Sequence, residues 1–140
     1  MPDQDYVGRV LSMNDLRRYI LELRKNLAPE EVVARSSRGV VNLTAWLTKH
    51  APESGMIGVY RPPLPNRLGE ADPFVLSKVT ALAKCHFAFP RVLDRFSSEM
   101  DFAVPIHETD WVAGVYGNPE PRPDLPPVDP EEFDVIVVPG

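Results

Sequence analysis

Few residues in this chain combine a reactive side chain with a spacing that indicates chemistry. The three histidines, His50, His86 and His107, lie far apart in the sequence and lack the spacing of metal ligands. The only cysteine, Cys85, excludes an intramolecular disulfide and a zinc site built from several cysteines, and we interpret it as a buried thiol at a strand edge. The sequence therefore predicts no metal site within this chain.

Three further residues stand where a ligand could contact them. Arg91 follows Phe89-Pro90 at the end of a predicted strand, where a cation could contact an anion, although a structural ion pair fits the sequence equally well. Met100 and Phe102 alternate along a predicted strand over residues 99–104, so they face either the core or a pocket wall. Of these two interpretations we favour the core.

The last eight residues, 133–140, read Phe-Asp-Val-Ile-Val-Val-Pro-Gly. Four consecutive aliphatic residues before Pro-Gly are typical of a parallel strand that is covered on both faces, which places it in the middle of a sheet. Open α/β sheets bind ligands in the loops after such strands, so Val138-Pro139-Gly140 is expected to lead into a functional loop. We therefore expect the domain to be incomplete at this end.

Two helices are predicted at the start of the domain, after a flexible leader over residues 1–12. Ser12 and Asp15 fit a capping box, and the apolar residues of the first helix form one stripe: Leu16, Ile20, Leu23 and Leu27. The second helix is expected from Pro29 to about His50, because proline is tolerated at a first helical position. Its buried face should contain Val33, Val40, Leu43 and Leu47.

The middle of the chain reads as a βαβ unit with two parallel strands. The strands are predicted over residues 56–60 and 86–89, the second stopped by Pro90, and Asp72 can cap a helix between them. A strand over residues 99–104 follows, with the segment 113–117 pairing near it. Residues 118–130 contain six prolines, and we interpret them as an ordered strap that crosses the surface of the same domain.

The composition indicates one globular domain. Hydrophobic residues make up 44% of the 140 residues and the formal net charge is −5, so a nucleic-acid partner is not expected. The chain lacks a signal peptide and any apolar run long enough to cross a membrane, which predicts a cytoplasmic protein without a membrane partner. We predict a single α/β domain over residues 13–140, with a mainly parallel sheet and flanking helices in three layers.

Several short segments, taken in order from about Met13 to Gly140, resemble the 5-formyltetrahydrofolate cyclo-ligase family, also called methenyltetrahydrofolate synthetase. Each segment is weak alone, and their joint order and spacing carry the resemblance. They are Leu16-Arg17 with Arg24, Leu27-Ala-Pro-Glu-Glu-Val32, Ile57 to Tyr60 with Pro62, Gly69-Glu70-Ala71-Asp72, Phe89-Pro90-Arg91-Val92, Met100-Asp101-Phe102, Gly117 with Pro119-Glu120-Pro121, and Phe133 to Gly140.

The resemblance implies an open, Rossmann-like sheet and the closure of 5-formyltetrahydrofolate to 5,10-methenyltetrahydrofolate, with ATP and Mg²⁺ as cofactors. It places Glu70 against the folate, where a carboxylate can accept paired hydrogen bonds from the donor edge of a pterin; the alternative is an acid that only precedes a helix. Arg61, Met100 and Phe102 fall at further substrate positions, and Arg61 replaces an apolar residue of the family.

The ATP site implied by the resemblance begins in the first helix. Arg17 matches an arginine that contacts phosphate, and Met13 stands at the family's lysine position, which removes one charge. Arg17 could instead be a solvated helix charge. The family's glycine-rich phosphate loop, expected about ten residues after Val-Pro-Gly, is not in this sequence.

That difference leaves three interpretations open. The chain is a cyclo-ligase, a catalytically silent folate- or nucleotide-binding module, or one piece of a larger assembly. An exposed flank of the last strand also predicts self-association into a homo-oligomer.

Overall fold

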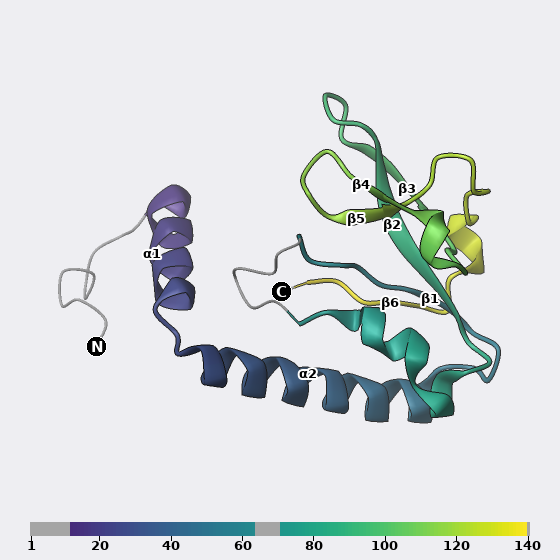
Figure 1. Ribbon diagram of the computed structural model, residues 1–140, viewed down its shortest axis with the longest axis horizontal. Helices are drawn as coiled ribbons and strands as arrows, with labels where there is room; N and C mark the ends of the chain where they lie inside the picture. The colour runs from purple at the N-terminus through teal and green to yellow at the C-terminus, as the bar shows by residue number, and fades with distance from the viewer. Residues whose placement is uncertain (1–11, 64–70, 140) are drawn as a thin grey trace.

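The computed structural model describes residues 12–63 and 71–139, which form a mixed α/β fold with a mainly parallel sheet (Figure 1). The α-helices are α1 (Met13–Lys25) and α2 (Pro29–His50). The strands are β1 (Met56–Gly58), β2 (His86–Asp94), β3 (Glu99–Ala103), β4 (Trp111–Ala113), β5 (Pro119–Pro121) and β6 (Val135–Ile136). Short 3₁₀ segments are η2 (Pro73–Lys78), η3 (Thr80–Leu82), η4 (Glu108–Asp110) and η5 (Pro130–Glu132).

Four strands form the main sheet in the order β3-β2-β1-β6. β1 is parallel to β2 on one side and to β6 on the other, with Ile57 opposite Phe87 and Val135. β3 completes the sheet antiparallel to β2. The predicted parallel pairing of these two strands is confirmed, whereas the described connection between them contains the 3₁₀ segments η2 and η3 in place of the expected α-helix.

Strand β2 does not stop at Pro90, contrary to the sequence prediction. It continues to Asp94, and Pro90 pairs with Phe102 of β3. Proline is tolerated at this point because β1 ends opposite Ala88, so no second strand needs a hydrogen bond from position 90.

Strand β6 lies at the edge of the described sheet, whereas the sequence predicted a strand in its middle. Val135 packs against the core, but Ile136 is 51% exposed, so only one face of the strand is covered. The aliphatic run over residues 135–138 therefore does not indicate burial on both faces here.

The hydrophobic core lies between the sheet and the C-terminal half of α2. It is formed by Leu47, Ile57, Val59, Leu76, Leu82, Phe87 and Phe89. Asp72 caps η2 as predicted, accepting a hydrogen bond from the backbone N–H of Phe74 at 3.0 Å. Within this segment, Leu76 and Leu82 are buried and Val75 is 43% exposed.

The apolar stripe predicted for α1 is not buried against the rest of the described chain. Ser12 caps the helix as predicted, accepting from the N–H of Asp15 at 3.1 Å. However, α1 contains no buried residue and stands apart from the sheet (Figure 1). Val33, near the start of α2, is also 65% exposed, because the N-terminal half of this helix extends beyond the core. Periodicity predicted both helices correctly but not what covers them.

The proline-rich strap is ordered, as predicted, and part of it forms a strand. β5 pairs antiparallel with β4, which shares only Ala113 with the segment 113–117, so the expected pairing of that segment near β3 is not found. Pro121 is fully buried, and the backbone N–H of Val128 donates to the carbonyl of Phe102 at 2.8 Å. Across the described residues, no helix is both long and apolar enough to span a membrane.

Candidate functional site

The carboxyl end of β1 is the topological switch point of the sheet. The chain leaves β1 for β2 on one side and returns to β6 on the other side. Pairing continues past the end of β1, because Val59 N–H donates to the carbonyl of Ala88 at 2.9 Å and Val137 N–H donates to that of Gly58 at 2.8 Å. Open α/β sheets bind ligands in the crevice outside such a point. The next residues of the chain, Tyr60 and Arg61, therefore occupy the candidate site.

Arg61 is held there by two aromatic rings. Its guanidinium carbon lies 4.0 Å from the ring centroid of Phe74 and 4.6 Å from that of Trp111. The two rings meet edge to face at 5.4 Å, and Trp111 also contacts Phe89 at 4.9 Å. The side-chain amide of Asn118 donates to the Arg61 carbonyl at 2.7 Å. These contacts fix both the backbone and the side chain of Arg61.

The turn before Trp111 is held by a buried carboxylate. Asp110 accepts hydrogen bonds from the backbone N–H groups of Ile106 at 2.9 Å and His107 at 2.8 Å. These two hydrogen bonds lower the pKa of Asp110, because they stabilise its charged form. The carbonyl of Asp110 also accepts from the N–H of Arg122 at 2.7 Å, which connects the turn to the strap. Trp111 is thus presented to Arg61 from a rigid turn.

Met100 and Phe102 lie elsewhere, in a groove that we call the β3–β6 groove. Its volume is about 590 Å³, and it is lined by Met100, Asp101, Phe102, Pro127, Val128, Asp129, Pro130, Phe133 and Ile136. Phe102 contacts Phe133 edge to face at 5.2 Å. Both sequence-predicted residues are therefore groove walls and not core residues.

The β3–β6 groove and Arg61 lie on opposite faces of the sheet. Gly58 pairs with Ile136 of the groove, and adjacent residues of a strand face opposite sides of the sheet. Its neighbour Ile57 therefore points to the other face, into the core. Phe89, which contacts Trp111, also belongs to this core. The structure consequently does not bring Met100 and Phe102 together with Arg61, although the resemblance gives all three to one substrate. Glu70 lies outside the described residues.

Arg91 is engaged in a buried ion pair. Its Nε and one terminal nitrogen donate to the two oxygens of Asp101 at 2.6 and 3.1 Å, and the other terminal nitrogen donates to the carbonyl of Arg122 at 2.6 Å. Arg91 is 5% exposed. This geometry supports the structural alternative over a contact with a ligand anion.

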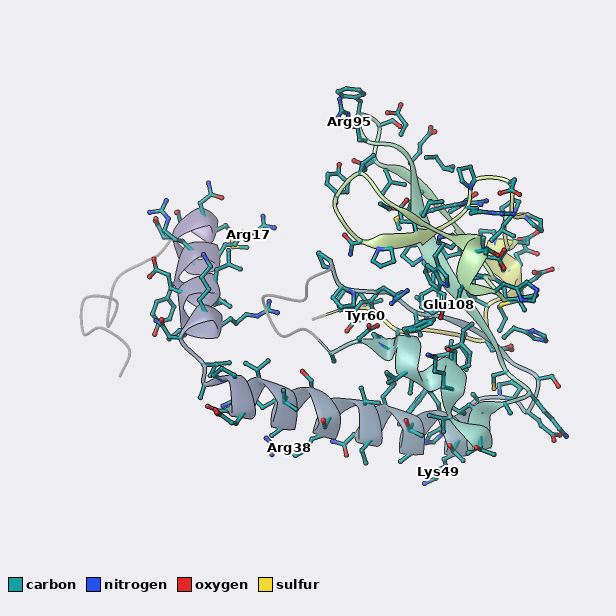
Figure 2. The ribbon with its side chains drawn as sticks, viewed as in Figure 1. Arg17, Arg38, Lys49, Tyr60, Arg95 and Glu108 are labelled. Carbon is teal, nitrogen blue, oxygen red and sulfur yellow. The ribbon has the colours of Figure 1, made fainter. Side chains whose placement is uncertain are left out.

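The residues predicted for ATP do not build a nucleotide site in the described part of the chain. Arg17 and Met13 lie on α1, apart from Tyr60 and the sheet (Figure 2), and Met13 is 81% exposed. The described ranges also bring together no three His, Cys, Asp or Glu side chains able to hold a metal ion.

Sequence reasoning missed Phe74, Trp111 and Asn118 as neighbours of Arg61. Phe74 lies in the segment that was predicted as a helix after Asp72, and Trp111 follows a polar segment without periodicity. The only signal in the sequence was Trp111 itself, a large aromatic residue that lies between two predicted strands and belongs to neither. Comparison of the chain with protein-family models, curated proteins and solved structures gives no match.

Proposed function

We propose that this chain binds a reduced folate at the carboxyl end of β1 and that it is a 5-formyltetrahydrofolate cyclo-ligase. The observation that carries the proposal is the switch point itself, with aromatic rings and a fixed cation beside it. Aromatic walls suit the flat pterin and benzoyl rings of a folate, which can stack or make edge-to-face contacts with them. The sequence resemblance supplies the substrate class.

The proposed activity is ATP- and Mg²⁺-dependent closure of 5-formyltetrahydrofolate to 5,10-methenyltetrahydrofolate. The formyl oxygen is a poor leaving group, and phosphorylation by ATP would convert it into a good one. The protein would position the reactants. The described residues support the folate part of this proposal, since two aromatic rings and Arg61 lie at the carboxyl end of β1. Turnover by this chain then needs phosphate contacts from other residues or from another chain.

The proposal also covers the layer arrangement of the fold and the cellular location of the protein. We propose the three-layer arrangement of the cyclo-ligases, in which further structure covers the face of the sheet that carries the β3–β6 groove, and a cytoplasmic location. The position of β6 at the edge of the described sheet supports a homo-oligomer formed through this edge. Ile136→Lys should then shift sedimentation toward the monomer, whereas an unchanged distribution would contradict assembly through β6.

The decisive test of function combines binding and turnover. Purified chain is mixed with 5-formyltetrahydrofolate, with and without ATP and Mg²⁺, and methenyltetrahydrofolate formation and folate affinity are measured. Turnover supports the cyclo-ligase, and binding without turnover supports the silent module. Turnover only after a partner chain is added supports the assembly, and absence of folate binding refutes the proposal.

Two pairs of variants locate the substrate. Glu70→Gln should weaken folate binding, because it removes a carboxylate acceptor for the pterin, while Glu132→Gln, an exposed control, should not. Met100→Ala tests whether folate binds in the β3–β6 groove. Phe96→Ala is its control, because Phe96 lies on the same hairpin but outside the groove and is 84% exposed. Equal folate affinity of Glu70→Gln and the unaltered chain would refute the role of Glu70.

A further inference from the structure

The guanidinium of Arg61 combines a fixed position with open hydrogen-bonding capacity. Its Nε is buried without a hydrogen-bond partner, and it forms no ion pair with any described residue. By contrast, Arg91 uses all three nitrogens in hydrogen bonds. A buried N–H without a partner costs free energy, so such groups are usually satisfied by a ligand, water or protein atom.

The surroundings of Arg61 favour an anion as that partner. Lys78 Nζ lies 5.0 Å from the centroid of Phe74, so a second cation is close to the same ring. Asp72, in the adjoining segment, uses one carboxylate oxygen to cap η2. Cation–π contacts with the nearly perpendicular rings of Phe74 and Trp111 hold the guanidinium in place. The planar fork of an arginine can bind carboxylate or phosphate oxygens through two parallel hydrogen bonds.

We propose that Arg61 is an anion subsite at the carboxyl end of β1, which binds a carboxylate or phosphate group of the ligand. Two sources share the chemistry, the glutamate carboxylates of a folate and the phosphates of a nucleotide. Only the folate arm of the test rests on the proposed function.

Trp111 supplies the readout, because the guanidinium lies 4.6 Å from its ring. The chain has two tryptophans, and Trp46→Phe leaves Trp111 as the sole indole fluorophore. In this background, inorganic phosphate and glutarate are titrated at constant ionic strength, with chloride as the reference salt. A saturable change in Trp111 emission with phosphate or glutarate, and none with chloride, is expected.

Three variants identify the group that binds. Arg61→Gln should weaken anion binding by about 10- to 100-fold, and Arg61→Lys, which keeps the charge but loses the planar fork, should retain part of it. Arg95→Gln is the matched control, because Arg95 also stacks on an aromatic ring, Phe96 at 4.8 Å, but at the tip of the β2–β3 hairpin (Figure 2). Thermal unfolding of each variant verifies that it folds.

Paired ligands then separate the two sources. If Arg61→Gln weakens tetrahydrofolate but not tetrahydropteroate, which lacks the glutamate, the anion is the folate tail. If it weakens ATP but not adenosine, the anion is a nucleotide phosphate. Phosphate binding that depends on Arg61 in a chain that binds no folate would leave the subsite standing and refute the proposed function. Equal responses to chloride and phosphate, or full anion affinity in folded Arg61→Gln, would overturn the subsite.

Discussion

The ion pair between Arg91 and Asp101 provides the most quantitative test of the packing beneath the candidate site. Asp101→Asn removes the countercharge from a guanidinium whose side chain is 6% exposed, while Asp101 itself is 23% exposed. Breaking a buried ion pair by removing one partner costs about 3–5 kcal/mol. Because Asp101 retains some contact with water, we expect the lower end of this range, about 3 kcal/mol.

Urea unfolding, monitored by far-UV circular dichroism, measures this loss. A slope of about 1–3 kcal/mol/M for a small protein converts this loss to a fall of about 1–3 M in the unfolding midpoint. Asp124→Asn is the control, since the Arg122–Asp124 pair at 2.8 Å has side chains 39% and 67% exposed and should lose less than about 1 kcal/mol.

Equal small losses in the two variants would refute the burial assigned to Arg91. If Asp101→Asn instead changed anion affinity without loss of stability, Arg91 would be the ligand contact that its position after β2 allows.

Three further substitutions test local packing and electrostatics. Gly58→Ala places a Cβ 3.0 Å from the Phe133 ring and should cost about 1–3 kcal/mol in thermal unfolding, whereas Gly39→Ala in α2 meets nothing within 4 Å and should gain about 1 kcal/mol; equal effects would contradict the close approach at Gly58. Burial raises the pKa of Glu120, and this effect outweighs the lowering by the N–H of Val92. The stability that the protonated Glu120 side chain contributes to the folded state is therefore present below its ordinary pKa and is lost as pH rises. Glu120→Gln should therefore raise the melting temperature at neutral pH, with a gain that shrinks toward pH 4; a pH-independent difference would refute this cause. The lowered pKa of Asp110 has the opposite sign, so Asp110→Asn should destabilise at neutral pH and the difference should narrow as acid protonates the native carboxylate; a constant difference would count against it.

Local signals in the sequence were sufficient for the helices and for the parallel strand pair. Ser12 caps α1, and α2 begins at Pro29 and ends at His50, because capping and proline preferences act within one turn. Alternating or continuous apolar runs gave β1, β2 and β3, although Pro90 was taken as a stop where only one neighbouring strand required pairing.

Long-range relations were beyond the sequence. Whether an apolar stripe on α1 is covered depends on what packs against it, and the edge position of β6 depends on strand order. The pairing of β4 with β5 joins a tryptophan segment to a proline-rich one, and Pro119-Glu120-Pro121 does not resemble an ordinary strand. Arg61 was selected as a substrate residue by resemblance, but its cation–π contacts with Phe74 and Trp111 follow only from the fold.

The central claim, that the ligand binds at the carboxyl end of β1, is tested most directly by NMR chemical-shift mapping with 5-formyltetrahydrofolate. The account predicts saturable shifts of the Trp111 indole, the Arg61 Nε–H and the backbone of Phe74, with little change at Phe102. Shifts concentrated at Met100, Phe102 and Phe133 in the β3–β6 groove, or none at saturating ligand, would contradict it.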